Sequence, residues 1–311
     1  MIYSAFKHKH PVLPESLNLF LEKLRPNAGQ KFQTLTQALF ERPTLDDENQ
    51  IAYAFRQPAN IVNSLLAKNR RHNFRFEQRR NKVERASLVQ RYCEGFEMPQ
   101  REDYLNLIKK DGRSRIVTSF HSGDFLYGAA SLFSLDSNQR NKYVLSLNRS
   151  CDACYSNLAA GFDRGALGPK SELLLCDTDS LELSGILRAG NASLLLFCDV
   201  PPGLNETIEV KFLDRQAWFS IGPAILALAN RVPLLPFINY STGNSSYLKL
   251  GGQIEPELLP SETLRMGAKR ITQSLVSFFE PVFLENPEQW RFLSLLPGYF
   301  SKPSTAAISR C

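Results

Sequence analysis

The alternation of short apolar runs with helical segments after about residue 113 constrains the fold more than any other feature of the sequence. The apolar runs have the length and composition of buried strands, and they cover 116–120, 143–147, 173–175, 194–197 and 232–237. The segments that fit helices lie near 125–134, 153–160, 180–189, 220–230 and 261–279. This order predicts an α/β fold with a mostly parallel central sheet flanked by helices. Residues that carry chemistry are expected at the carboxyl ends of its strands.

The first third of the chain has a different pattern, which favours helices. Residues 1–105 are expected to form an N-terminal helical region, and residues 106–311 the α/β domain. One helix is expected to start after Ser16, and another is expected within 47–68, interrupted at Pro58. A chain of 311 residues with 43% hydrophobic residues can bury one large core together with such a helical extension.

Lysine and arginine are concentrated in residues 68–91, where only Glu77 and Glu84 oppose them. The net charge of +6 also suits anionic partners, such as lipid headgroups or an acidic carrier protein. A solvated helix face is the alternative interpretation of this run. A nucleic-acid binder that uses Phe74 and Phe76 is a rival interpretation. The α/β half of the chain argues against it, so we expect no nucleic-acid partner.

Nothing in the sequence indicates a segment that crosses a membrane. No uncharged apolar stretch approaches about 18 residues, and the N-terminus has no apolar leader. We therefore expect peripheral contact with an anionic membrane through the basic run. The cysteines follow no disulfide framework, which favours the reducing cytoplasm. The pair Cys151 and Cys154 has no second pair beside it, so no metal site is predicted.

His121 is the histidine whose position indicates chemistry. It follows the apolar run 116–120 and precedes an expected helix, so it lies at the carboxyl end of a strand. A neutral imidazole at that place can take a proton from a hydroxyl nucleophile. A carboxylate must then orient the ring, and Asp124, in the first turn of the following helix, is the nearby candidate. A histidine that caps the helix or bonds within the core is the alternative.

Two further constellations are candidate substrate-binding sites. Asp199 follows the buried run 194–197, so its carboxylate is expected at a strand tip, where it is either a site residue or a loop cap. Gly222 begins an apolar helix built of small residues, and the free N–H groups of that helix end can hold an anion or an oxyanion. A helix packed tightly in the core explains the small residues equally well.

The order of these blocks resembles the lysophospholipid acyltransferase-like superfamily and, within it, the lipid A biosynthesis (late) acyltransferases. The resemblance spans roughly residues 75–300. It starts with His121-Ser122-Gly123-Asp124-Phe125, which is similar to the family's His-x-Gly-Asn-Trp-Glu block. The other similar blocks are Asn148-Arg149, the segment 187–212, the segment 217–239, and the closing Pro-x-x-Trp motif at Pro287–Phe292.

One position departs from the family pattern. The family places an acid five residues after the histidine, and here that position holds Leu126, which cannot orient an imidazole. We therefore predict that Asp124 supplies the carboxylate. The alternatives are a histidine that works without a partner, or a catalytically inactive relative that binds lipid or a carrier protein.

The resemblance implies transfer of a fatty acyl chain from acyl carrier protein or coenzyme A to a hydroxyl of a lipid A-like or other lipid or metabolite acceptor. The enzyme would work from the cytoplasmic side of the bacterial inner membrane, with His121 as general base. Arg149 or backbone N–H groups would stabilise the oxyanion, and neither a metal nor a tightly held cofactor is required. The acyl chain is expected in an apolar groove lined by Phe120, Phe125, Leu126 and Phe197.

Overall fold

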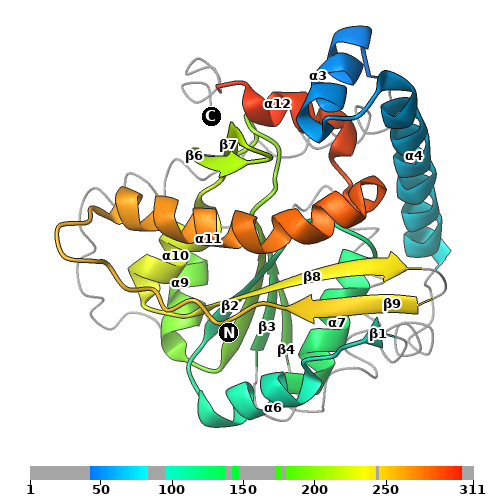
Figure 1. Ribbon diagram of the computed structural model, residues 1–311. Coiled ribbons are helices and arrows are strands. Elements are labelled where there is room, and N and C mark those ends of the chain that lie inside the picture. Colours follow the sequence, from blue (N-terminus) through cyan, green and yellow to red (C-terminus); the bar gives the residue numbers. More distant parts are fainter. Residues whose placement is uncertain are drawn as a thin grey trace.

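The computed structural model describes residues 43–82, 96–136, 142–146, 172–176, 180–242 and 245–302 (Figure 1). The described strands are β1 (Phe96–Glu97), β2 (Arg115–Ser119), β3 (Lys142–Ser146), β4 (Glu172–Cys176), β5 (Ala192–Phe197), β6 (Thr207–Phe212), β7 (Arg215–Ser220), β8 (Leu234–Thr242) and β9 (Ser245–Leu250). The described α-helices are α3 (Leu45–Phe55), α4 (Ala59–Lys82), α6 (Arg101–Lys110), α7 (Phe125–Asp136), α9 (Ser180–Ala189), α10 (Gly222–Asn230), α11 (Leu264–Glu285) and α12 (Leu296–Phe300). Short 3₁₀ turns η3 (Pro287–Gln289) and η4 (Leu293–Leu295) connect α11 to α12.

The central sheet has the order β1-β9-β8-β2-β5-β3-β4. The strands β8, β2, β5, β3 and β4 pair in parallel, whereas β9 pairs antiparallel to β8 and parallel to β1. Strand β2 therefore lies in the middle of the sheet, between β8 and β5. Its residues are all buried, as expected for a parallel strand covered on both faces.

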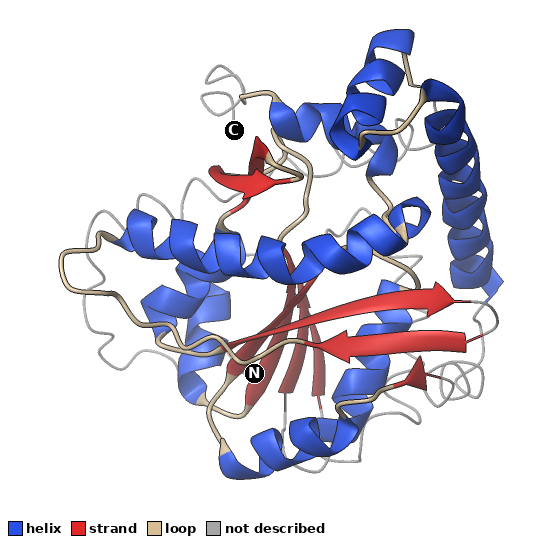
Figure 2. Cartoon of the chain, in the orientation of Figure 1, coloured by secondary structure: helices blue, strands red, loops and turns tan. Residues whose placement is uncertain are grey.

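Helices cover both faces of the sheet (Figure 2). On one face α9, α10 and α11 pack over a large apolar core that includes Ile116 of β2 and Leu194 of β5. On the other face α7 packs over a second apolar cluster that includes Val117 and Leu195, the next residue of each strand. Neighbouring residues of one strand thus enter different cores, because successive side chains of a strand point to opposite faces.

The helices α3 and α4 are the first described elements of the N-terminal helical region. Thr44 caps α3, where its side chain accepts a hydrogen bond from the backbone of Asp47 and the Asp47 side chain accepts one from the Thr44 backbone. The helix ends at Arg56, which has a left-handed φ of 53°, and Pro58 lies between α3 and α4. Along α4, a buried stripe faces the rest of the molecule, and it consists of Val62, Leu66, Asn69, Asn73 and Phe76.

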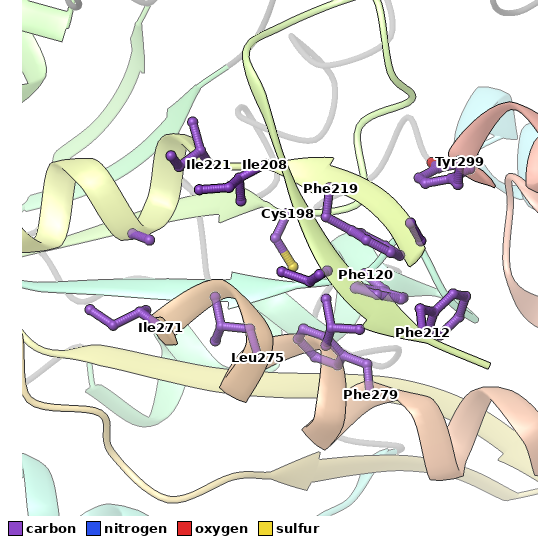
Figure 3. Packing of buried hydrophobic residues seen from close by; sticks show 14 of the residues in the cluster. Phe120, Cys198, Ile208, Phe212, Phe219, Ile221, Ile271, Leu275, Phe279 and Tyr299 are labelled. Atoms are coloured by element: carbon purple, nitrogen blue, oxygen red, sulfur yellow. The ribbon is translucent and has the colours of Figure 1, made fainter. Parts of the chain in front are cut away.

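The hairpin of β6 and β7 lies apart from the central sheet and was not predicted from the sequence. Its two-residue turn is Leu213–Asp214, with φ values of 52° and 58°. A turn with two positive φ values usually contains Asn-Gly or a similar pair, so this sequence carries no hairpin signal. Phe212 and Phe219 of the hairpin enter the core beside Phe120 (Figure 3).

The predicted fold class is confirmed, with a mostly parallel central sheet, flanking helices and an N-terminal helical region. The predicted strand runs match β2, β3, β4, β5 and β8, while the helices expected after Ser16 and near 153–160 lie outside the described residues. The strand β1 lies before residue 106 and pairs with β9, so the expected helical region contains one strand of the central sheet. The domain division itself stays a prediction. Among the residues that the structure describes, no helix is long and apolar enough to span a bilayer.

Candidate active site

The pairing register of β2 and β5 builds the site. Ser119 is the partner of Phe197 across these parallel strands, so the two chains leave the sheet at the same edge. His121 and Asp199 each stand two residues beyond these partners. The two side chains therefore meet, although they lie 78 residues apart in the sequence.

Two hydrogen bonds join His121 to the carboxylate of Asp199. Imidazole Nδ1 lies 2.7 Å from Oδ1, and the backbone N–H of His121 donates to Oδ2 over 2.7 Å. An ionised carboxylate can only accept, so Nδ1 carries the proton and Nε2 of the neutral ring keeps its lone pair. The Asp199 side chain is fully buried, whereas 16% of the His121 side chain is exposed. The pair thus has the form of a general base oriented by a carboxylate.

Two aromatic residues from the C-terminal part of the chain also hold Asp199. The Trp290 indole N–H donates to Oδ2 over 2.7 Å, and the Tyr299 hydroxyl donates to the backbone carbonyl over 2.5 Å. Burial, and then the nearby Asp199 charge, raise the pKa of Tyr299 well above its usual value, so this hydroxyl stays protonated. The Asp199 carboxylate thus accepts hydrogen bonds from the backbone N–H of His121 and from the indole N–H of Trp290.

Residues 287–292, which we name the C-terminal strap, lie alongside the loop that follows β2. Ser122 and Trp290 form an isolated antiparallel bridge. The backbone N–H of Arg291 donates to the carbonyl of His121 over 2.8 Å, and that of Gly123 donates to the carbonyl of Gln289 over 3.1 Å. The sequence indicated this Pro-x-x-Trp motif without indicating what it contacts. The structure places it directly against the histidine loop.

Aromatic rings surround the His121 imidazole. The Phe197 ring stacks on it with a centroid distance of 3.9 Å, and the rings of Phe125 and Phe292 are T-shaped to it with centroid distances of 4.8 and 4.9 Å. An apolar wall of this kind suits a hydrocarbon chain. The expectation that Phe120 also lines a groove here is wrong. Phe120 alternates to the opposite face of the sheet, where it is fully buried against α11 (Figure 3).

The comparison with protein families falls on this half of the chain. Residues 171–295 match the family described as bacterial lipid A biosynthesis acyltransferase. Over this segment the chain is similar to that family. The segment contains Asp199, Gly222 and Trp290, and the resemblance inferred from the sequence is confirmed over it. No curated protein matches the chain significantly.

The match over this segment is consistent with an acyltransferase enzyme. The histidine block at residues 121–125 precedes the matched segment, so its likeness to the family stays an inference from the sequence. The structure nevertheless joins the two parts, because the carboxylate that holds His121 comes from inside the matched segment.

The orienting carboxylate differs from the prediction. We expected Asp124 to hold the imidazole, and Asp199 occupies Nδ1 instead. Asp124 is buried immediately before α7. We also expected Asp199 to contact substrate, and its fully buried carboxylate is engaged by His121 and Trp290. The strand order puts β5 next to β2, which sequence proximity alone does not reveal.

The remaining predicted site residues fall in different places. Phe125 is buried and contacts the imidazole, as described above. Gly222 is the first residue of α10, and its role in binding stays a prediction. Leu126 is the second residue of α7, and its side chain lies outside the described part of the structure, as does all of Arg149.

Cys198 lies next to Asp199 in the chain and is the other group at this strand tip with reactive chemistry. It is fully buried, and its thiol lies 3.8 Å from the carbonyl of Ser119. Burial and then the Asp199 charge raise the pKa of the Cys198 thiol. A protonated, inaccessible thiol is a poor nucleophile, so the arrangement favours chemistry by His121.

Proposed function

We propose that the chain transfers a fatty acyl group from a thioester donor to a hydroxyl of a lipid acceptor, with His121 as the general base and Asp199 as its orienting partner. The observation that carries this proposal is the 2.7 Å contact between imidazole Nδ1 and the buried Asp199 carboxylate. It leaves Nε2 as the basic nitrogen of a ring that is partly exposed.

The proposed reaction begins when Nε2 of His121 takes the proton of the acceptor hydroxyl. The oxygen attacks the thioester carbonyl, a carbon–oxygen bond forms, and the carbon–sulfur bond breaks. The thiolate that leaves then receives the proton from the imidazolium. Asp199 stabilises the positive ring while it exists, as a carboxylate does in other base–carboxylate pairs. The donor in this proposal is acyl carrier protein or coenzyme A, and the acceptor is a lipid A-like molecule or another lipid or metabolite.

The catalytically inactive alternative was motivated by Leu126 at the family's acid position. The contact between His121 and Asp199 supports the active interpretation, because it supplies a carboxylate from another strand. The donors around Asp199 come from the C-terminal strap as well as from the histidine loop, so the pair is held from two directions. An inactive binding protein has no need of so specific an arrangement.

Peripheral contact with an anionic membrane surface is part of the proposal. On the outer face of α4, Lys68, Arg71 and Arg75 are exposed, and 56% of Phe74 is exposed beside them. Each basic residue close to an anionic surface contributes about 1 kcal/mol, and an exposed aromatic ring can enter the interface. On the buried face of the same helix, Phe76 stacks on Phe125 at 4.8 Å, and Phe125 contacts the His121 ring.

The decisive experiment compares the wild-type protein with the His121→Ala variant. Transfer of a radiolabelled acyl chain is measured with acyl carrier protein and with coenzyme A as separate donors, using a lipid A-type acceptor. We expect His121→Ala to lower turnover by roughly 10²–10⁴-fold while the melting temperature stays close to wild type. Turnover near the wild-type rate in a folded variant would contradict the role of His121.

Vesicle sedimentation tests the membrane contact separately. The wild-type protein should bind vesicles with anionic lipid and leave neutral ones, and 1 M salt should release it because the screening length falls from about 10 Å to about 3 Å. A variant with Lys68, Arg71 and Arg75 changed to Glu should lose the binding. Binding that only detergent reverses would point to insertion of apolar segments and would contradict an electrostatic contact.

A further inference from the structure

Two asparagines occupy core positions of α4. Asn69 and Asn73 are 0% and 1% exposed, and they continue the buried stripe that starts at Val62 and Leu66 and ends at Phe76. The spacing of three and four residues is that of a helix face packed on a core. Leucine at these positions would bury more apolar surface, whereas a buried amide is costly unless its hydrogen bonds are made.

The amides make their hydrogen bonds to the C-terminal strap. Asn69 Nδ2 donates to the carbonyl of Glu288 over 2.9 Å and to that of Trp290 over 2.6 Å. Asn73 Nδ2 donates to the carbonyl of Arg291 over 3.1 Å and lies 3.4 Å from Oδ1 of Asn69. Helix α4 thus holds three backbone carbonyls of a segment about 220 residues away in the chain.

The same strap residues hold the catalytic pair. Trp290 donates its indole N–H to Asp199, and the backbone of Arg291 donates to the carbonyl of His121. A sliding of the strap along α4 would therefore move the indole away from the carboxylate. Directional amide hydrogen bonds fix this register, which apolar contact with α4 cannot do, because apolar packing is not directional.

We propose that Asn69 and Asn73 are positioning residues for acyl transfer. They set the C-terminal strap so that Trp290 and the strap backbone hold Asp199 and His121 in working geometry. This inference rests on the proposed function for its kinetic consequence and on the geometry alone for its structural one. It makes α4 a part of the catalytic apparatus as well as the candidate membrane contact.

The test replaces each asparagine by leucine, which is apolar and similar in size. Asn69→Leu and Asn73→Leu should lower kcat by about 10²-fold, since small displacements of a reacting group have effects of that size. The KM of the donor should change less than about threefold. Asn69→Gln, which keeps an amide donor, should recover part of the loss. The matched control is Asn60→Leu, at an exposed position of the same helix.

A spectroscopic readout separates positioning from stability. Trp218 and Trp290 are the only tryptophans of the chain, so a Trp218→Phe background makes Trp290 the sole reporter. In that background the leucine variants should shift or quench Trp290 emission, and the ¹⁵N signal of His121 Nδ1 should move in histidine-labelled protein. Asn60→Leu should leave both signals unchanged.

The outcomes are distinguishable. Leucine variants that keep wild-type kcat, Trp290 emission and the His121 signal would overturn the proposal, as would variants that lose only thermal stability. If the leucine variants fail to fold, Asn69→Ser and Asn73→Ser take their place with the same readouts. If the wild-type protein transfers no acyl group, the proposed function fails. The fluorescence and NMR readouts then still decide whether the asparagines hold the strap.

Discussion

His121 and Asp199 meet because each lies two residues beyond Ser119 and Phe197, which are direct partners in the pairing of β2 with β5. The carboxylate that contacts the His121 ring therefore comes from the neighbouring strand and not from the histidine's own loop. Parallel pairing without a slip is required for the contact, since a shift of one residue would turn one side chain to the other face of the sheet. The central strands thus determine the site geometry directly.

Asp199→Asn should lower kcat by roughly 10²–10⁴-fold, because asparagine presents an amide group to the N–H donors of His121 and Trp290 and no longer stabilises a positive imidazole. The double variant that carries Asp199→Asn and His121→Ala should have a kcat only slightly below that of His121→Ala alone. Asp124→Asn is the matched comparison and should retain more activity than Asp199→Asn. Steady-state kinetics of these variants test the prediction. If Asp124→Asn lost more activity than Asp199→Asn, Asp124 would be the orienting carboxylate.

The sequence predicted the central fold well because buried parallel strands read as uninterrupted apolar runs, as in 194–197. It could not predict the β6–β7 hairpin, whose turn uses Leu213 and Asp214 at positive φ. Local spacing favoured Asp124 as the carboxylate, three residues after the histidine. The choice of Asp199 depends on which strands are neighbours, and a single sequence does not contain that information in readable form.

The C-terminal strap illustrates a second limit of the sequence. The Pro-x-x-Trp motif was visible, and its resemblance to the family was correct over the matched segment. Its function as a support for Asp199 depends on the indole N–H of Trp290 and on amides of α4 that are more than 200 residues away. Asparagines within a basic run read as surface residues, so Asn69 and Asn73 gave no signal before the structure.

Trp290→Phe keeps an aromatic ring among Phe212, Phe283 and Tyr299 but removes the donor to Asp199. A hydrogen bond to a charged group contributes about 1.5–3 kcal/mol, and we expect a loss of that size in the free energy of unfolding, together with a lower kcat. Urea unfolding followed by circular dichroism measures the free energy of unfolding. Trp218→Phe is the control, and equal stability of both variants would argue against the bond.

Asp111 should make the free energy of unfolding depend on pH in the acidic range. Burial raises the pKa of its carboxyl, but hydrogen bonds from the side chain and backbone of Arg113 outweigh burial and lower the pKa from 3.8 to about 2. The folded pKa is below the unfolded one, so the ionised carboxylate stabilises the fold above about pH 4. This contribution is lost as the pH falls towards about 2.

Asp111→Asn should therefore reduce the free energy of unfolding at pH 7 by about 1 kcal/mol, a value below the full shift because Arg113 is half exposed. The difference from wild type should shrink as the pH is lowered from 4 to about 2. Urea unfolding at several pH values measures it. A difference that stays constant over this range would show that Asp111 acts through packing and not through its charge.

Gly123→Ala should be severely destabilising because the position excludes a side chain in two ways. Gly123 has a φ of +57°, and an added Cβ would lie 2.6 Å from Oδ1 and 2.8 Å from the backbone oxygen of Asn239. The backbone oxygen belongs to the central strand β8 and cannot move aside cheaply. We expect a loss of roughly 2–4 kcal/mol in the free energy of unfolding.

Gly185→Ala is the matched control for this substitution. Gly185 lies inside α9, and an added Cβ would meet nothing within 4 Å. Alanine there should stabilise the protein by about 0.5–1 kcal/mol, since glycine is a poor helix former. The urea midpoints of the two variants should therefore move in opposite directions.

The Gly123→Ala variant should also show reduced turnover if it folds. Gly123 lies two residues after His121, and its N–H donates to the carbonyl of Gln289 in the C-terminal strap. A stable, fully active Gly123→Ala variant would show that the loop after β2 can rearrange without disturbing the proposed catalytic pair, His121 and Asp199.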